Sequence, residues 1–305
     1  MQMHYRPLGR TGFMASQIAA GDLADRALPL ETCVATLTRA LDAGVNVVDT
    51  APGYEDGFSE QIVGAAVRPR RDHIYVIDKI DDFTRPLADQ LAESLQRLGL
   101  SYIDAYLFHG LSSLDEYRRL TAPNGLFAEA RHLKNSGKIR HMGISSHHPD
   151  VLRQAILDGW CDVAMFAIGA FVDSRYITDT LPLCRAHGVG SVCFKTFGAG
   201  KLVADTTGYG APLTQRPRGK RSSGGVDSTP TSHVLTPADC LHYTLTVNPD
   251  VALLGMSFPN EQDHVFAAYA QFTPLDESQL RDIERRAVMA RADKGPCWWN
   301  PDPHV

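Results

Sequence analysis

Three side chains that can exchange protons stand at equal intervals along the chain. Asp49, Lys79 and His109 are thirty residues apart, each at the end of a short apolar run, and Tyr54 follows five residues after Asp49. A phenol has a pKa of about 10, and a nearby ammonium lowers that pKa by favouring the phenolate. A paired carboxylate keeps the ammonium charged, and an imidazole can orient a carbonyl oxygen through a hydrogen bond. The four side chains together predict an acid–base site that acts on a carbonyl group.

Each of these residues has a simpler interpretation when it is taken alone. Asp49 could cap the following loop, Lys79 could extend to water, and His109 could be a satisfied histidine at a strand end. A lysine at a barrel strand end could also be the nucleophile of a Schiff-base lyase. The acidic partner argues against the lyase, because a lysine paired with Asp49 stays protonated.

The elements that would position these residues alternate between short apolar runs and amphipathic stretches. The apolar runs do not alternate with polar residues, which is typical of strands buried on both faces of a parallel sheet. We expect strands at residues 17–20, 45–48, 74–78, 103–108, 139–143, 162–167, 190–194 and 251–254. We expect helices at residues 30–43, 59–67, 86–98, 114–136, 150–157, 177–187, 237–248 and 260–270, and a final helix at 276–291.

Eight strand–helix units predict an α/β fold of one domain over residues 1–305, an eight-stranded parallel (β/α)8 TIM barrel. Barrel enzymes place their chemistry at the C-terminal ends of the strands, so Asp49, Lys79 and His109 should meet at one rim. An open doubly wound sheet is the alternative. That sheet would need a glycine-rich turn after its first strand, which Gly21-Asp22-Leu23-Ala24 does not supply.

Three segments fall outside the repeating pattern. Residues 1–16 should form a hairpin around Gly9-Arg10-Thr11-Gly12 that closes one end of the barrel. Residues 203–233, rich in Gly, Ser, Thr and Pro, should form a long loop after strand seven, either over the active-site face or as a solvated insertion. Residues 276–305 should form a C-terminal helix and tail, whose adjacent Trp298 and Trp299 have large apolar areas to bury.

Composition excludes several classes of protein. Hydrophobic residues are 44% and charged residues 21% of the 305 residues, as in a globular protein, and the net charge of -5 does not favour a nucleic-acid partner. No apolar run approaches the roughly 18 residues that a membrane span needs. Six cysteines without a C-x-x-C pair indicate reduced thiols and a cytoplasmic location. The pair His147-His148 precedes a helix start at Pro149-Asp150, so we expect a loop there and no metal site.

The stretch at residues 44–60 (GVNVVDTAPGYEDGFSE) resembles the signature of the aldo-keto reductase family. The resemblance continues through Lys79, residues 104–109 (DAYLFH) and residues 137–146 (GKIRHMGISS). It implies a nicotinamide-dependent oxidoreductase that transfers a hydride to or from a small aldehyde, ketone or sugar. Tyr54 would be the proton donor, Lys79 and Asp49 would tune it, and His109 would orient the substrate.

The same resemblance implies which residues contact the cofactor. Ser145 and Ser146 would bind the nicotinamide carboxamide, and Phe194 would stack on its ring. The start of the helix after strand eight is a natural phosphate site, since its free N–H groups and dipole favour anions. The full set is Gly21, Asp22, Ser145, Ser146, Met165, Phe194, Lys195, Gly255, Ser257, Asn260 and Glu261.

Some positions depart from the family pattern. Met165 stands where a glutamine is usual, and Met256 and Gln262 stand where NADP-using relatives often carry cations. We expect NADP(H), with NAD(H) as the alternative, and the basic residues between Arg216 and Arg221 could replace the missing cations. A non-catalytic regulatory protein that binds the cofactor is the second functional interpretation.

The substrate should be a small-molecule carbonyl or alcohol, bound by loops at the same rim. Asp22 lies there, and a carboxylate would suit a hydroxylated substrate. The other candidates for the pocket lining are Leu23, Phe83, Leu111, Phe171, Trp298 and Trp299.

Overall fold

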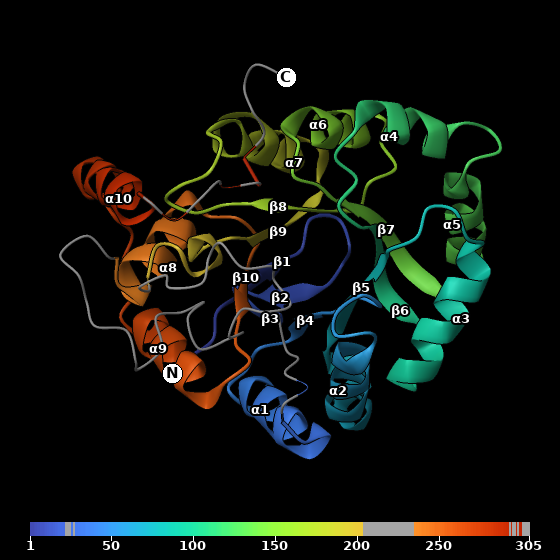
Figure 1. Ribbon diagram of the computed structural model, residues 1–305, viewed down its shortest axis with the longest axis horizontal. Coiled ribbons are helices and arrows are strands. Elements are labelled where there is room, and N and C mark those ends of the chain that lie inside the picture. The colour runs from blue at the N-terminus through green and yellow to red at the C-terminus, as the bar shows by residue number, and fades with distance from the viewer. Residues whose placement is uncertain are drawn as a thin grey trace.

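The computed structural model describes residues 1–21, 26, 28–203, 235–292, 294, 297, 299 and 300. Within them, eight parallel strands close into a barrel in the order β10-β3-β4-β5-β6-β7-β8-β9 (Figure 1). The strands are β3 Ile18–Gly21, β4 Val47–Asp49, β5 Tyr75–Ile80, β6 Ile103–Phe108, β7 Ile139–Ser145, β8 Val163–Ala167, β9 Gly190–Phe194 and β10 Val251–Gly255. Closure occurs where β10 pairs with β3, for example at Gly255 and Gly21. The barrel is therefore confirmed and the open doubly wound sheet is excluded.

Helices surround the barrel on its outer side. They are α1 Leu30–Asp42, α2 Phe58–Val67, α3 Leu87–Leu98, α4 Leu114–Thr121, α5 Leu126–Asn135, α6 Pro149–Leu157, α7 Leu181–His187, α8 Pro237–Val247, α9 Pro259–Ala270 and α10 Glu277–Ala290. Short turns of other helix types lie at η1 Arg68–His73, η2 Tyr176–Thr180 and η3 Gly198–Gly200. Thr236 caps α8 and forms a capping box with Asp239.

Two expected helices differ from the observed ones. The single helix expected at 114–136 is wrong, because the chain breaks between α4 and α5. Pro123 disfavours a helical Ala122, and a Cβ on Gly125 would lie 2.1 Å from the carbonyl oxygen of Leu120. The helix expected at 177–187 begins with the π-type turn η2 and becomes an α-helix only from Leu181.

Side chains alternate between two cores along each strand. Val47, Ile77 and Leu107 point into the barrel, where they pack with Val163 and Val192. Their neighbours in sequence, such as Val48 and Val76, pack instead against the surrounding helices. Because side chains two residues apart share a face, the residue two positions after an inward one also faces the interior at the rim. Asp49, Lys79 and His109 each follow such a residue by two positions.

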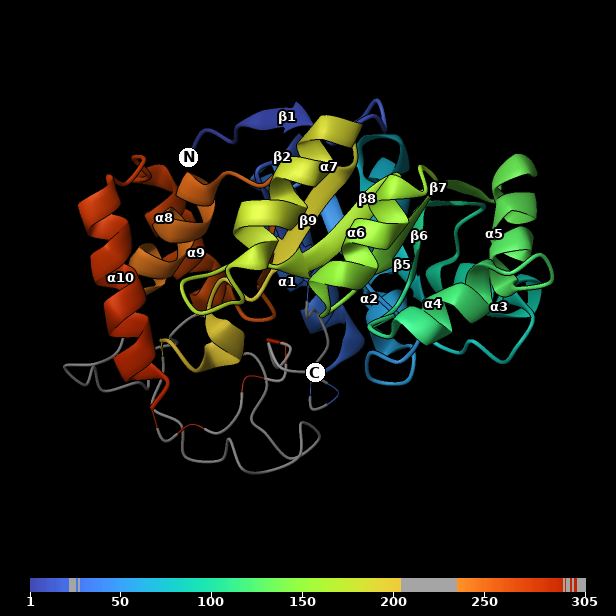
Figure 2. The same cartoon turned by 90° about the horizontal axis from the view of Figure 1, so that it is seen from above.

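A hairpin covers the opposite end of the barrel, where the strands begin. Strands β1 Tyr5–Pro7 and β2 Met14–Ser16 pair antiparallel, as the sequence predicts (Figure 2). Gly9 is required here, because a Cβ on it would lie 2.2 Å from the backbone nitrogen of Gly190. Arg10 donates to the carbonyl oxygens of Gly159 and Cys161, at 3.1 and 2.9 Å. The hairpin thus seals this end and leaves the other rim for a site.

Some expectations fall on residues that the structure does not describe. The segment expected at 203–233 lies outside the described residues from 204 onward, and so do Asp22, Leu23 and Trp298. Trp299 is described and is 1% exposed, with its carbonyl oxygen accepting from the hydroxyl of Tyr176 at 3.1 Å. None of the described helices combines the length and the apolar character that a bilayer-spanning segment requires.

Candidate active site

A buried ion pair lies at the rim where β4 and β5 end. The Nζ of Lys79 donates to Oδ1 of Asp49 and to the carbonyl oxygen of Thr50, both at 2.6 Å. Burial alone would lower the pKa of Lys79, but the Asp49 carboxylate and the other acidic groups around it together outweigh burial and hold that pKa above its usual value. Burial raises the pKa of Asp49, and Lys79 opposes this rise. The pair therefore keeps a charged ammonium at a place from which water is excluded.

The loop between β4 and α2 brings Tyr54 over this ammonium. The Nζ of Lys79 lies 4.6 Å from the centre of the Tyr54 ring. The loop turns sharply after Tyr54, because Glu55, Asp56 and Gly57 all have positive φ angles of 51°, 50° and 82°. Left-handed backbone at Glu55 and Asp56 costs energy, so the surrounding structure must hold this turn in place.

His109 completes the group from the end of β6. Its Nε2 lies 3.5 Å from the hydroxyl of Tyr54, at the outer limit of a hydrogen bond. The two rings meet edge to face, with centroids 5.6 Å apart. The structure therefore brings together Asp49, Tyr54, Lys79 and His109, which are spread over sixty residues of sequence.

Sequence reasoning missed Asp81, which contacts His109 of this group and the residue before Tyr54. Its Oδ1 accepts a short hydrogen bond from Nδ1 of His109, and its Oδ2 accepts from the backbone nitrogen of Gly53 at 2.6 Å. A signal was present in the sequence, because Asp81 follows Lys79 by two positions and so shares its face of the strand.

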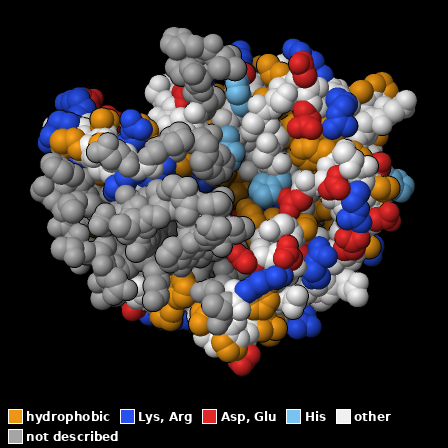
Figure 3. Space-filling view, in the orientation of Figure 1, with side chains coloured by type: hydrophobic (Ala, Val, Ile, Leu, Met, Phe, Trp, Pro, Cys, Tyr) orange, Lys and Arg blue, Asp and Glu red, His pale blue; other side chains and the backbone are white. Residues whose placement is uncertain are grey.

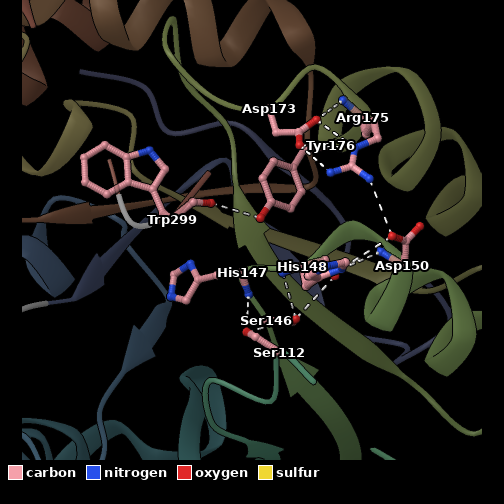
Figure 4. A network of polar contacts seen from close by, with 9 residues as sticks. All are labelled: Ser112, Ser146, His147, His148, Asp150, Asp173, Arg175, Tyr176 and Trp299. Atoms are coloured by element: carbon pink, nitrogen blue, oxygen red, sulfur yellow. Dashed lines mark hydrogen bonds and ion pairs between the residues drawn. The ribbon is translucent and has the colours of Figure 1, made fainter. Parts of the chain in front are cut away.

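The serines expected to hold the carboxamide lie at the end of β7 and at the start of the loop that follows it. Ser145 ends β7, and the hydroxyl of the fully buried Ser146 accepts from the backbone nitrogen of His148 at 3.1 Å. Ser112 lies 3.4 Å from the same hydroxyl (Figure 4). His148 caps α6, as a helix start at Pro149 requires. Ser146 thus orders this loop in the structure.

Phe194 ends β9 and presents a half-buried ring. The ring contacts His147 edge to face at 5.1 Å between centroids, and the Nζ of Lys195 lies 5.5 Å from the ring centre. The same Nζ lies 5.4 Å from the ring of Trp299, so the described part of the tail packs beside this strand end. Met165 is 1% exposed and packs inside the barrel with Val192.

The residues expected to bind the phosphates of the cofactor lie where β3 and β10 meet and around the start of α9. Gly21 and Gly255 are paired across the two strands, so two residues without Cβ lie side by side there. Glu261 is fully buried, and its carboxylate accepts from the backbone nitrogens of Ser257 and Phe258, at 3.0 and 3.3 Å. Asn260 lies in the first turn of α9. Glu261 therefore already accepts from two of the backbone N–H groups that precede this helix.

A cation approaches the same helix from another element. Arg39 of α1 donates to the carbonyl oxygen of Pro259 at 2.9 Å and pairs with Asp263. Its Nη1 is also 3.4 Å from Oε1 of Gln262. Gln262 itself is fully buried and donates to the carbonyl oxygen of Thr36 at 2.8 Å. A positive charge thus lies near the start of α9, although Met256 and Gln262 supply none.

The face seen in Figure 1 lies opposite to the hairpin. In the described part of this face, Figure 3 shows histidine and acidic side chains around a hollow that exposes apolar side chains. The side chains of His109 and Asp81 are 27% and 26% exposed. Both are therefore accessible to a small molecule, whereas Lys79 and Asp49 beneath them are not.

Known proteins are similar to this chain in sequence and in fold. The model of the Aldo/keto reductase family matches residues 15–287. The NADH-specific methylglyoxal reductase of Escherichia coli is 29% identical over 230 residues, which are 66% of this chain and 69% of that protein. The L-galactose dehydrogenase of Arabidopsis thaliana is 26% identical over 312 residues, covering 93% of this chain and 94% of that protein.

Two solved structures share the barrel. The holo form of an aldo-keto reductase from Bacillus halodurans has a TM-score of 0.71 and 24% identity, covering 93% of this chain and 96% of that one. An aldo-keto reductase from Klebsiella pneumoniae in complex with NADPH has a TM-score of 0.68 and 22% identity, covering 93% and 95%. The family model spans most of the barrel, including the strand ends that carry the four grouped side chains. This chain belongs to the aldo/keto reductase family.

Proposed function

We propose that this protein is an NAD(P)(H)-dependent oxidoreductase that interconverts small aldehydes, ketones or sugars with the corresponding alcohols. The observation that supports it most strongly is the charged Lys79, held by Asp49 and placed 4.6 Å from the ring centre of Tyr54. The bound nicotinamide supplies or takes up the hydride. The residues of this chain bind and orient the substrate, and they transfer the proton.

Tyr54 is the proposed general acid and base. Its hydroxyl gives a proton to the carbonyl oxygen during reduction and takes one from the alcohol during oxidation. Lys79 stabilises the phenolate that forms, because an adjacent positive charge favours the ionised phenol. Asp49 keeps Lys79 charged, and His109 lies next to the Tyr54 hydroxyl and orients it.

The residues present fit a nicotinamide dinucleotide. Gly21 and Gly255, paired at the joint of β3 and β10, present backbone without side chains there. The Phe194 ring offers a flat apolar face at the end of β9. Met165 is buried among aliphatic side chains, so we assign the carboxamide to Ser145 and Ser146 and give Met165 a packing role.

The proposed cofactor is NADP(H), with NAD(H) as the alternative. The relative from Klebsiella pneumoniae was solved with NADPH, whereas the relative from Escherichia coli is named as NADH-specific. Arg39 places a guanidinium near the start of α9, where a 2′-phosphate would need a cation. Asp263 partly neutralises Arg39, which keeps NAD(H) as a competitor.

A Schiff-base lyase is disfavoured by the same ion pair. An amine attacks a carbonyl only when it is unprotonated. The carboxylate of Asp49 favours the protonated form of Lys79. Borohydride treatment with a ketone should therefore trap no adduct on Lys79.

The test is an assay of the purified protein with a panel of aldehydes, ketones and sugars, following the absorbance of NADPH and NADH. Tyr54→Phe should lower kcat by about 10²–10⁴-fold, the usual contribution of a general acid–base group. Binding of the nucleotide, measured by tryptophan fluorescence, should stay unchanged. Tyr102→Phe is the control, because its ring keeps its place between Arg71 and Arg140 at the opposite end of the barrel. Nucleotide binding without turnover of any substrate would favour the non-catalytic interpretation.

A further inference from the structure

The carboxylate of Asp81 contacts two neighbouring parts of the site, one with each of its oxygens. Oδ1 accepts the short hydrogen bond from Nδ1 of His109. Oδ2 accepts from the backbone nitrogen of Gly53, the residue before Tyr54, at 2.6 Å. One side chain thus connects the ends of β5 and β6 with the loop that carries Tyr54.

The contact with His109 determines which ring nitrogen carries the proton. Burial would raise the pKa of Asp81, but the contacts with His109 and Gly53 and the charge of Lys79 together outweigh it and hold that pKa below its usual value. An ionised carboxylate only accepts hydrogen bonds, so Nδ1 of His109 must be the donor. In the neutral ring the other nitrogen, Nε2, then carries a lone pair. That lone pair lies 3.5 Å from the Tyr54 hydroxyl.

We propose that Asp81 is a positioning residue of this site, in which one carboxylate oxygen fixes Nε2 of His109 as the hydrogen-bond acceptor facing Tyr54 and the other holds the Tyr54 loop. The part that concerns turnover rests on the proposed function. The assignment changes the expected role of His109. A neutral ring in this state accepts from a hydroxyl of Tyr54 or of an alcohol substrate, and it does not donate to a carbonyl oxygen.

The second contact matters because the loop is strained. Glu55 and Asp56, which follow Tyr54 directly, have positive φ, and such backbone at residues other than glycine persists only where the surroundings hold it. The hydrogen bond from Gly53 to Asp81 restrains the residue just before Tyr54. The hydroxyls of Thr50 and Ser59, 2.9 Å apart, restrain the two ends of the loop. Asp81 therefore sets the distance between the Tyr54 hydroxyl and the imidazole.

Asp81→Asn breaks one of these two contacts while keeping the shape of the side chain. An amide has a single acceptor oxygen and a donor nitrogen, whereas the site presents two donors. If the amide nitrogen faces His109, the ring must carry its proton on Nε2. If it faces Gly53, two N–H groups oppose each other and the loop moves.

The first measurement is nitrogen NMR of isotope-labelled histidine rings. Wild-type protein should show His109 protonated on Nδ1, and Asp81→Asn should move the proton to Nε2 or produce a mixture. His109→Asn identifies the signal among the 12 histidines by removing it. A role in folding alone would not change this tautomer.

The second measurement is turnover. In Asp81→Asn, kcat should fall by about tenfold. This loss is smaller than the loss of about 10²–10⁴-fold that is expected when a general acid–base group is removed. The affinity for NADPH should stay unchanged. Asp81→Glu should recover part of kcat because it restores two acceptor oxygens. Gly53→Ala should also lower kcat, because its Cβ would lie 2.7 Å from Oδ2 of Asp81 and would disturb the contact between Asp81 and the Tyr54 loop.

Asp82→Asn is the matched control, because that carboxylate accepts from the backbone nitrogen and hydroxyl of Thr84 and does not contact His109 or Gly53. Full kcat in Asp81→Asn together with an unchanged His109 tautomer would overturn the proposal. If the wild-type protein turns over no carbonyl, the proposed function fails, and the NMR comparison still decides the tautomer. If Asp81→Asn does not fold, Asp81→Glu and Gly53→Ala supply the same comparison.

Discussion

The Nζ of Lys79 lies 2.6 Å from Oδ1 of Asp49, and the two side chains are 1% and 3% exposed. Neighbouring strands of the barrel hold the two residues. Neither charge is stable alone in this position, because removing one partner of a buried pair leaves an uncompensated charge. The pair acts as one unit, and substitutions in it should affect activity and stability together.

The charge on Lys79 should depend on Asp49. Asp49→Asn keeps a hydrogen-bond acceptor for Nζ but removes the carboxylate that raises the pKa of Lys79. Burial then lowers that pKa, so the alkaline limb of the kcat profile should move to lower pH. Measuring kcat against pH checks this. Asp42→Asn, in an exposed ion pair with Arg70, is the control. A profile that keeps its alkaline limb would show that Asp49 does not sustain the ammonium.

Acid should destabilise the fold partly through His147. Burial lowers the pKa of His147 to about 3 in the folded protein, whereas an unfolded histidine has a pKa of about 6.5. As the pH falls from about 6.5 towards 3, the unfolded chain binds a proton that the folded chain does not, so stability decreases. His147→Gln should shrink the difference between Tm at neutral pH and Tm at about pH 4.5. The exposed His132→Gln serves as control, and equal differences in both variants would refute the prediction.

Stability should depend strongly on an ion pair between α2 and α3. Arg97 pairs with Glu60, whose side chain is fully buried. Arg97→Met should lower the free energy of unfolding by about 3–5 kcal/mol, the usual cost of leaving one partner of a buried pair. Urea unfolding measures the loss, and adding Glu60→Gln should recover part of it. Arg85→Met, in the exposed pair with Glu93, should change the free energy of unfolding far less, because water screens an exposed pair. Equal losses in the two arginine variants would contradict this account.

Nucleotide preference should respond to the pair at the start of α9. Asp263→Asn removes the carboxylate that pairs with Arg39, so the guanidinium becomes available to a 2′-phosphate. The affinity for NADPH relative to NADH should rise by about tenfold, comparable to a hydrogen bond between charged groups. Arg39→Gln should change the ratio in the opposite direction. Fluorescence titrations with both nucleotides decide this, and parallel changes for NADPH and NADH would exclude a role for Arg39.

Much of the architecture could be predicted from local patterns. The expected strands at 103–108 and 190–194 coincide with β6 and β9. The equal spacing of Asp49, Lys79 and His109 predicts one rim, because each interval spans one strand–helix unit. The expected helix at 114–136 failed where Pro123 and Gly125 interrupt it. A helical pattern of apolar residues can continue through a break, so periodicity alone does not reveal one.

The sequence by itself determined the eightfold repeat, the rim on which the four side chains gather and the family resemblance, because these depend on periodicity and on short motifs that are local in the chain. Only the tertiary structure decided that Asp81 contacts both His109 and Gly53, that Arg39 reaches α9, and that Glu261 binds the amides before that helix. Such contacts join side chains from different elements. They depend on how far one strand or helix is shifted relative to its neighbour, and no spacing along the chain records that shift.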